Sequence, residues 1–313
     1  MSDVLRAFGK GIWFADGATV SYYGFDYPTR MVLIQLSEGQ LFVWSPIALS
    51  GKLQRDIAAL GTVSFLVSPN RLHHLFLQEW KAAYPRALAY ASPGLRNKRP
   101  DIVFDGELGD LPESAWAPDI DQVVVGGSPL TEVEFFHHPS RTVIFADLIQ
   151  NFQPDWFKGW RAIVARLDGI CAPNPGAPRE WRLLFYNRRI ARSAMRRILT
   201  WPIERVLVAH GNRFCSTAKR FCAVLSSGFL GQKRVPEPLT LGVRSVMGRL
   251  LTAGVTLTGN IVMQRRAMRS CWRFGTRTCP IGNDASHNHD GSNGGNHAAS
   301  TPFPVPGVIR ISH

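Results

Sequence analysis

The stretch that decides the fold is Val63 to Glu79, V-S-F-L-V-S-P-N-R-L-H-H-L-F-L-Q-E. Four of its first five residues, Val63, Phe65, Leu66 and Val67, are apolar and include β-branched valines, which predicts a buried strand. Pro69 and Asn70 end that strand, because proline offers no N–H to a sheet and asparagine favours turns. Leu75 to Ala83 then has helical apolar spacing. His73 and His74 are therefore predicted in a short loop at the carboxyl end of a strand, where open α/β folds bind their ligands.

The surrounding chain contains many predicted strands and few helices. Two hairpins are expected, one at Arg30–Pro46 and one at Val133–Ala146, each with a short loop of turn-forming residues. Helical spacing is found at 53–60 and 186–199, further strands at 86–90, 121–125 and 204–209, a long polar loop at 96–118, and a last helix at 217–225. This pattern predicts an α/β or α+β sandwich and argues against a helix bundle.

Composition indicates a globular domain followed by a different kind of tail. The 313 residues are 45% hydrophobic and 19% charged, with a formal net charge of +13. Much of this positive charge falls from Gln232 onward, where basic residues are frequent and acidic ones few. We expect one domain over residues 1–231. Residues 232–313 are expected to be a basic, low-complexity tail, with a Gly/Asn/Ser/His-rich run at 283–300 that has too little apolar surface to order itself.

Cysteine usage and the N-terminus point to a soluble cytoplasmic protein. The chain has 5 cysteines, an odd number, and none of them forms a C-x-x-C pair. The first ten residues lack a signal-peptide core. We also expect no membrane span, because no window reaches the roughly 20 apolar residues that a spanning helix needs.

Side chains suited to metal binding or to acid/base chemistry follow three predicted strands. His73 and His74 follow the first, Asp147 follows 142–146, and His210 follows 204–209. Strand ends on the same side of a sheet converge, and imidazole nitrogens with a carboxylate are ligands for zinc or iron. A site with an open coordination position activates water. The alternative is structural, because a single histidine at a strand end is more often only a hydrogen-bonding group.

Other candidates are weaker. His137 and His138 lie at a strand-to-turn junction beside a proline and are expected to be solvated. The arginines of the 186–199 helix lack interleaved aromatic residues, so we interpret them as a solvated face; nucleic-acid binding through this helix and the tail is a third, less favoured hypothesis. Phosphate-cradling, dinucleotide-binding and nucleophile-elbow motifs are absent from the sequence.

The order strand, histidine loop, strand ending in Asp, strand ending in His resembles the metallo-β-lactamase-like hydrolase superfamily. The segments S-P-N-x-x-H-H-L-F-L-x-E-W (68–80), A-D-L-I-x-N-F (146–152) and A-H-G (209–211) resemble an uncharacterised domain-of-unknown-function branch of it. The resemblance runs from about Gly11 to Leu230. It implies a four-layer αββα sandwich with a metal site at one edge of the two sheets.

This sequence departs from the superfamily's first metal motif, H-x-H-x-D-H. Aligning the last histidine of that motif with His74 puts His73 in place of the aspartate, Arg71 in place of the second histidine and Pro69 in place of the first. The resemblance therefore implies one ion, zinc first and iron or manganese as alternatives, held by His73, His74, Asp147 and His210. Asp147 is expected as a ligand or general base. Arg71 is expected to bind an anionic group or to stabilise developing negative charge.

The implied function is metal-dependent hydrolysis of an ester, thioester, lactone or phosphoester in a small-molecule substrate. The alternative is a fold member that binds no metal and acts as a ligand- or partner-binding protein. Both hypotheses use the same residues, so the geometry of the three strand ends distinguishes them best.

Overall fold

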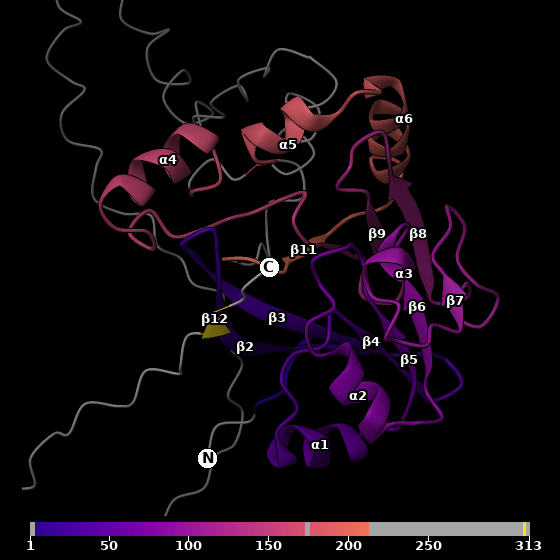
Figure 1. The fold of residues 1–313 in the computed structure, drawn as a ribbon. Coiled ribbons are helices and arrows are strands. Elements are labelled where there is room, and N and C mark those ends of the chain that lie inside the picture. Colours follow the sequence, from indigo (N-terminus) through magenta and orange to yellow (C-terminus); the bar gives the residue numbers. More distant parts are fainter. Residues whose placement is uncertain (1–3, 173–175, 213–308, 311–313) are drawn as a thin grey trace, which may run out of the picture. The chain divides into compact units, whose positions relative to one another are not determined.

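The computed structural model describes residues 4–172, 176–212 and 309–310, and these form two β-sheets with helices on their outer faces (Figure 1). The larger sheet has the strand order β1-β2-β3-β4-β5-β6-β7, with β12 paired to β2. Its strands are β1 (Arg6–Gly9), β2 (Ile12–Tyr22), β3 (Phe25–Gln35), β4 (Gln40–Trp44), β5 (Thr62–Val67), β6 (Leu88–Ala91), β7 (Gly106–Glu107) and β12 (Ile309–Arg310). Strands β1 to β4 are antiparallel, whereas β4 to β7 are parallel.

The smaller sheet has the order β11-β10-β9-β8. Its strands are β8 (Ile120–Val125), β9 (Glu132–His137), β10 (Thr142–Phe145) and β11 (Arg205–Val208). The predicted hairpin at 133–146 is confirmed, because β9 and β10 pair antiparallel. β10 and β11 pair parallel, with Phe145 opposite Val208. Asp147 and His210 each lie two residues beyond that last pair, so the two side chains leave the sheet at the same edge.

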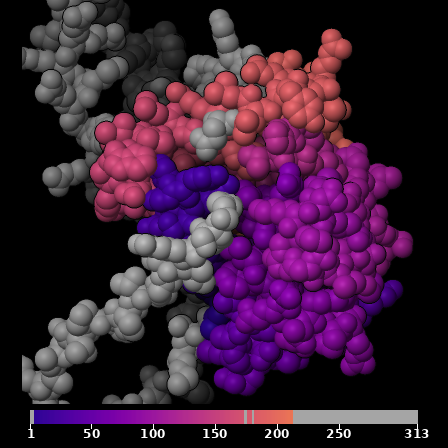
Figure 2. All heavy atoms as spheres, in the orientation of Figure 1, coloured from indigo at the N-terminus to yellow at the C-terminus, as the bar shows by residue number. Residues whose placement is uncertain are grey.

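The tip of the β2–β3 hairpin packs against helix α4 (Trp160–Asp168). The guanidinium of Arg161 donates to the carbonyl oxygen of Gly24, and the rings of Phe25 and Trp160 meet edge to face with centroids 5.4 Å apart. Figure 2 shows the pink atoms of α4 against the indigo atoms of this hairpin. The hairpin therefore reaches beyond the sandwich and is held there by a helix that the sequence analysis did not predict.

Apolar side chains fill the space between the two sheets. The larger sheet contributes Phe14, Val32, Phe42 and Val67, and the smaller sheet contributes Val133, Phe135, Ile144 and Leu207. All of these are almost completely buried. Because side chains alternate along a strand, every second residue of these strands faces this core and the rest face the helices.

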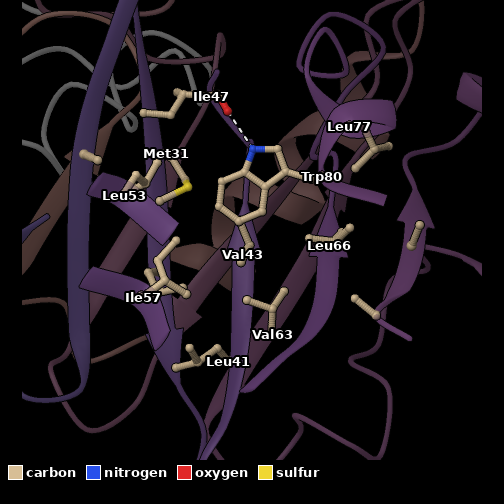
Figure 3. Close-up of a cluster of buried hydrophobic side chains, with 14 of the residues drawn as sticks. Met31, Leu41, Val43, Ile47, Leu53, Ile57, Val63, Leu66, Leu77 and Trp80 are labelled. Atoms are coloured by element: carbon tan, nitrogen blue, oxygen red, sulfur yellow. Dashed lines mark hydrogen bonds between the residues drawn. The ribbon is translucent and has the colours of Figure 1, made fainter. Parts of the chain in front are cut away.

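Helices α1 (Gly51–Ala58) and α2 (Leu77–Ala83) cover the outer face of the larger sheet. Leu53 and Ile57 of α1 and Trp80 of α2 pack on sheet residues such as Val43 and Leu66 (Figure 3). The indole N–H of Trp80 donates to the carbonyl oxygen of Ile47 at 2.6 Å, so this large ring is buried without an unpaired donor.

Helices α5 (Arg179–Leu184) and α6 (Arg188–Ile198) cover the outer face of the smaller sheet. Ala191, Ala194, Met195 and Ile198 of α6 face this core, and its arginines lie on the other side. The predicted αββα sandwich is thereby confirmed in its layers: helices, sheet, sheet, helices. Inside it, the buried guanidinium of Arg30 on β3 donates to the carbonyl oxygens of Val208 and Gly211, which joins the two sheets near the end of β11.

The structure differs from the sequence predictions in three places. The helix expected from Leu75 begins at Leu77, because the Asn70 side chain binds the backbone N–H groups of Leu72 and His73 and holds 70–76 as turns. The expected polar loop at 96–118 contains most of the short helix α3 (Leu95–Lys98), the strand β7 and the buried Trp116. Strands β1 and β2 and helices α4 and α5 were not predicted.

The predicted helix at 217–225, the boundary at 231/232 and nearly all of the expected tail lie outside the described residues, so these stay predictions. Within the described part of the chain, no helix is long and apolar enough to cross a membrane.

Candidate metal centre

Three of the strand-end residues converge on one point. His73, Asp147 and His210 each offer a ligand atom, and these atoms lie within 4.8 Å of one another. The Nε2 atom of His73 is 3.2 Å from Asp147 Oδ2, and the Nε2 atom of His210 is 3.1 Å from Asp147 Oδ1. One carboxylate thus stands between two imidazoles, with one oxygen facing each.

Each imidazole is oriented by the nitrogen that faces away from Asp147. The Nδ1–H of His210 donates to the carbonyl oxygen of Pro28 at 2.7 Å, and His73 Nδ1 lies 2.7 Å from the hydroxyl of Ser45. A carbonyl oxygen only accepts, which fixes the proton of the neutral His210 ring on Nδ1 and leaves the Nε2 lone pair toward the cluster. Ser45 has a φ of 52°, a conformation unusual for a non-glycine residue, and this brings its hydroxyl under His73.

Asn70 connects the histidine loop to the carboxylate. Its Nδ2 group donates to Asp147 Oδ2 at 2.8 Å and to Glu132 Oε2 at 2.8 Å, and its Oδ1 accepts from the N–H groups of Leu72 and His73. The same side chain therefore positions the loop that carries His73 and the Asp147 oxygen that this histidine faces.

Glu132 holds the segment that carries Asp147. Its two carboxylate oxygens accept from the backbone N–H groups of Ala146, Asp147 and Leu148 at 2.9, 2.9 and 3.2 Å. Glu134, two residues along on the same face of β9, is also fully buried. Burial and the neighbouring Glu132 raise the pKa of Glu134 well above its ordinary value, so Glu134 keeps its proton to a higher pH than an exposed glutamate does.

The electrostatics of the cluster favour positive charge beside Asp147. Burial alone raises the pKa of Asp147, but the charges of His73 and His210 and their hydrogen bonds outweigh it and hold the pKa below its ordinary value. Burial lowers the pKa of His73, and the charge of Asp147 outweighs this too and raises it. The negative charge that favours a proton on His73 also favours a metal cation placed among the three donors.

A cavity of about 430 Å³ opens onto the cluster. Its polar lining includes His73, His74, Lys98, Asp147 and His210. Most of the remaining wall is apolar or aromatic and comes from the β2–β3 hairpin, the loop before α2, and α4 and the residues after it. This wall includes Val20, Tyr22, Tyr23, Phe25, Tyr27, Leu72, Phe76, Val164, Ile170 and Trp181. The volume suits a small organic molecule.

Several solved structures share this arrangement of sheets and helices. The metal-soaked Flv1 flavodiiron core from Synechocystis sp. PCC6803 superposes with a TM-score of 0.50 at 12% identity, covering 72% of this chain and 60% of that one. The DIM-1 metallo-β-lactamase exposed to ceftazidime gives 0.49 at 12% identity, covering 71% and 96% of the two chains. A metallo-β-lactamase from Pontibacter korlensis gives 0.47 at 11% identity, covering 71% and 98%.

The likeness to the Flv1 core supports the αββα sandwich as the fold of this chain. No protein-family model matches the sequence, and no curated protein does. At these identities the likeness extends to the fold alone, so the branch suggested by the S-P-N-x-x-H-H motif stays a prediction.

Two residues predicted for the site lie beside the cluster but not in it. His74 turns its Nδ1 toward the guanidinium of Arg99 at 2.9 Å, and it is not one of the three converging residues. Burial, then the charges of Lys98 and Arg99, lower the pKa of His74 to about 4. Arg71 packs against Gly94 and does not line the cavity. The fold thus brings His73, Asp147 and His210 together and gives His74 and Arg71 other neighbours.

The expectation that His137 and His138 are both solvated is wrong for His137. His137 is completely buried in β9, with Nδ1 2.7 Å from the Ser140 hydroxyl, whereas His138 is exposed in the turn. His137 pairs with Thr142 in the ladder between β9 and β10, so it belongs to the strand and not to the solvated turn.

Sequence reasoning missed Ser45, Asn70 and Glu132 as parts of the site. Asn70 had been assigned only to a turn. The signal for Glu132 was present in E-V-E-F-F (132–136), where two carboxyls alternate with apolar residues in a strand predicted to be buried. A buried carboxylate needs partners, and here those partners are the backbone of the neighbouring site segment.

Proposed function

We propose that this chain is a metal-dependent hydrolase in which His73, Asp147 and His210 hold one divalent ion. The observation that carries the proposal is the shared position of the three donor atoms, with both Nε2 atoms directed at one carboxylate. Two imidazoles and a carboxylate, with a position left open, form the donor set of many catalytic zinc sites. Iron(II) and manganese(II) accept the same donors, so zinc is the first ion to test and these two are alternatives.

The protein's own contribution is to prepare these donors. The Pro28 carbonyl and the Ser45 hydroxyl fix the ring orientations of His210 and His73, and Asn70 with Glu132 fixes Asp147. An ion bound there would polarise a carbonyl or phosphoryl oxygen and activate water. The lowered pKa of Asp147 makes it a weak base, and this favours the role of ligand over that of general base.

The substrate in this proposal is a small molecule with an ester, thioester, lactone or phosphoester bond. The cavity supports this, because its lining is mostly apolar or aromatic and it presents the three donors together. A water-excluding wall strengthens every electrostatic interaction at the reacting group.

The first test is the metal content of the full-length chain after dialysis against zinc, iron(II) or manganese(II). We expect about one tightly held ion per chain in the wild type, and its loss in His210→Ala and Asp147→Asn. His138→Ala is the matched control, because His138 is an exposed histidine on the same domain. All variants keep the histidines of residues 283–313, so adventitious binding there is common to all and cancels in the comparison.

Equal metal content in the wild type, His210→Ala and His138→Ala would overturn the metal site. A screen of ester, thioester and phosphoester substrates follows if the ion is confirmed, with His210→Ala expected at the background rate. The second candidate, a binding protein without metal, is favoured by the positions of His74 and Arg71 outside the cluster. It would lead if no ion is retained even after reconstitution.

A further inference from the structure

We propose that the substrate of this centre is an acidic amphiphile: an apolar chain or ring system lies at one end of the cavity and an anionic group at the other, with the three donors between them. The inference rests on the proposed function and deepens it by naming the substrate class. Three features carry it: an aromatic path from His210, an apolar mouth at α4, and an unpaired cation beside His74.

The aromatic path begins at the cluster itself. The ring of Tyr27 meets the imidazole of His210 edge to face, with centroids 5.3 Å apart. Tyr27 also contacts Phe157, which in turn contacts Phe25, at 6.4 and 5.5 Å between centroids. Tyr27 and Phe25 both line the cavity. On the side of His210, a bound molecule therefore meets aromatic rings first. Asp168, at the end of α4, also lines the cavity, and its carboxylate accepts from the backbone N–H of Arg179.

This apolar wall continues to the molecular surface. Tyr23 and Val164 line the cavity and are also 77% and 41% exposed, so they mark its mouth between the β2–β3 hairpin and α4. On α4, Trp160, Ile163 and Leu167 lie beside Val164 at helical spacing and are exposed as well. The helix thus presents an apolar stripe to the outside at the mouth of the cavity, which suits the entry of an apolar chain and not of a polar metabolite.

The opposite end of the cavity is cationic. Lys98 lines the cavity, and its ammonium group donates to the backbone carbonyl of Arg71 at 3.2 Å. Among the described residues Lys98 has no carboxylate partner, whereas the nearby Arg99 is paired with Asp101. Burial and the charges of Arg71 and Arg99 lower the pKa of Lys98. An anionic group bound here would relieve the repulsion among these cations.

His74 adds a hydrogen-bond donor at this end. Its Nδ1 atom faces the guanidinium of Arg99, which only donates, so Nδ1 accepts and the hydrogen of the neutral ring is on Nε2. His74 lines the cavity next to His73. His74 is then a positioning residue for the acidic group of the substrate, and this role accounts for its place outside the three-donor cluster.

A chain of contacts places the cationic end and the apolar end of the cavity on opposite sides of the three donors. Lys98 and Arg99 adjoin His74, which is next to His73, and His73 shares Asp147 with His210. Beyond His210 come Tyr27 and the rings that lead to α4. A molecule with its acid at Lys98 and its chain past Tyr27 would place its middle, the bond to be cleaved, over the three donors.

The test is the binding of straight-chain alkyl sulfonates, from butyl to decyl, to the full-length protein by isothermal titration calorimetry. Sulfonates are anionic, cannot be hydrolysed and are poor metal ligands, so their binding reports the cavity and not the centre. Burying one methylene contributes about 0.8 kcal/mol, so we expect the affinity to rise about fourfold per methylene until the apolar end is filled. The alcohols of the same lengths should show the same slope.

Lys98→Met should weaken the binding of every sulfonate by about two- to fivefold, in line with the worth of a partly exposed ion pair, and leave the alcohols unchanged. Lys10→Met, at an exposed lysine outside the lining, is the control. Val164→Asp should reduce the slope with chain length, whereas Ile163→Asp, at its exposed neighbour outside the lining, should not. Binding independent of chain length, or equal losses for sulfonates and alcohols in Lys98→Met, would overturn the inference.

These outcomes are separable from failure of the hydrolase proposal. The titrations are made with zinc-loaded and with metal-free protein, and they need neither catalysis nor an ion. If the protein holds no metal, but sulfonate affinity still rises with chain length and falls in Lys98→Met, then the chain is an amphiphile-binding protein and the hydrolase proposal is wrong. If an ion is confirmed but sulfonate affinity does not change with chain length, only the proposal of an amphiphilic substrate is wrong.

Discussion

Asn70 and Asp147 are joined by a hydrogen bond of 2.8 Å between the Nδ2 group of one and the Oδ2 atom of the other, and through it the histidine loop of one sheet is fixed to the site segment of the other. The same nitrogen binds Glu132, and the Asn70 oxygen binds two backbone N–H groups of the loop. The geometry of the centre therefore depends on a residue that offers no ligand atom to it.

Replacing Asn70 tests this dependence. Asn70→Ala should lower metal affinity about 10- to 100-fold, the usual effect of losing a partner that orients a ligand. It should also cost about 1–3 kcal/mol of the free energy of unfolding, because buried acceptors and donors lose their partners. Competition with a chelator and urea denaturation measure the two effects. Asn97→Ala, at an exposed asparagine of α3, should change neither, and an unchanged metal affinity in Asn70→Ala would contradict the assigned role.

Glu132 and Glu134 should respond differently to the same isosteric change. Glu132→Gln replaces an acceptor of backbone N–H groups by a group that partly donates, and should cost at least about 1.5–3 kcal/mol of stability. Glu134→Gln replaces one neutral group by another and should cost little at pH 5. Urea denaturation of both variants measures the two free energies of unfolding. Equal losses of stability in the two variants would show that Glu134 is not protonated.

The raised pKa of Glu134 also gives a pH dependence. The folded state keeps a proton that the unfolded chain releases above its ordinary pKa of 4.5, so wild-type stability should fall as the pH rises from there toward the folded-state pKa. Glu134→Gln cannot release this proton, so its stability should not fall over this pH range for that reason. Its stability relative to wild type should rise with pH by up to about 1.4 kcal/mol per unit. Parallel pH profiles for the two proteins would disprove the assignment.

Asp147 and His73 give the metal-free protein a window of maximal stability. The lowered pKa of Asp147 contributes stability that is present above its ordinary pKa of 3.8 and is lost as the pH falls. The raised pKa of His73 contributes stability that is complete below its ordinary pKa of 6.5 and is lost as the pH rises through the higher folded-state pKa. Denaturation midpoints should therefore be highest between these values. In Asp147→Asn, the loss of stability on both the acidic and the basic side of this window should be smaller. In His138→Ala, the pH dependence of stability should be unchanged.

Gly211 should be intolerant of a side chain. Its φ is 91°, and an added Cβ would overlap the carbonyl oxygen of Asn151. Gly211→Ala should therefore move the segment that carries His210 and reduce metal binding. Gly39 also has a positive φ, of 79°, but an added Cβ there meets nothing within 4 Å. Gly39→Ala should cost only the backbone strain, about 1–2 kcal/mol, and keep the metal. Similar metal affinities in the two variants would exclude this explanation.

The apolar patterns predicted an α/β or α+β sandwich, because the strands carry period-2 or continuous apolar patterns and the outer helices α1 and α6 carry helical ones. The four αββα layers came from the resemblance to a known superfamily. The sequence also indicated the three converging residues, because strand ends in a sheet share an edge. The roles of Ser45, Asn70 and Glu132 in the site could not be predicted, although E-V-E-F-F marked Glu132 as a carboxyl in a strand, because their partners are far away in sequence and are brought near only by the docking of the two sheets. The direction of His74 was equally hidden, since it depends on Arg99, a residue with no pattern of its own.

The link from Arg30 to the carbonyl oxygens of Val208 and Gly211 has a consequence for how the protein is made. Arg30 belongs to an early hairpin, and its acceptors arrive only after 178 and 181 further residues. Contacts of such separation form slowly, because a long loop must close before they contribute. We expect the nascent chain to assemble strands β1 to β7 first and to gain affinity for an ion only when β11 docks, because His210 follows that strand. Uptake of the ion would then report the final step of maturation.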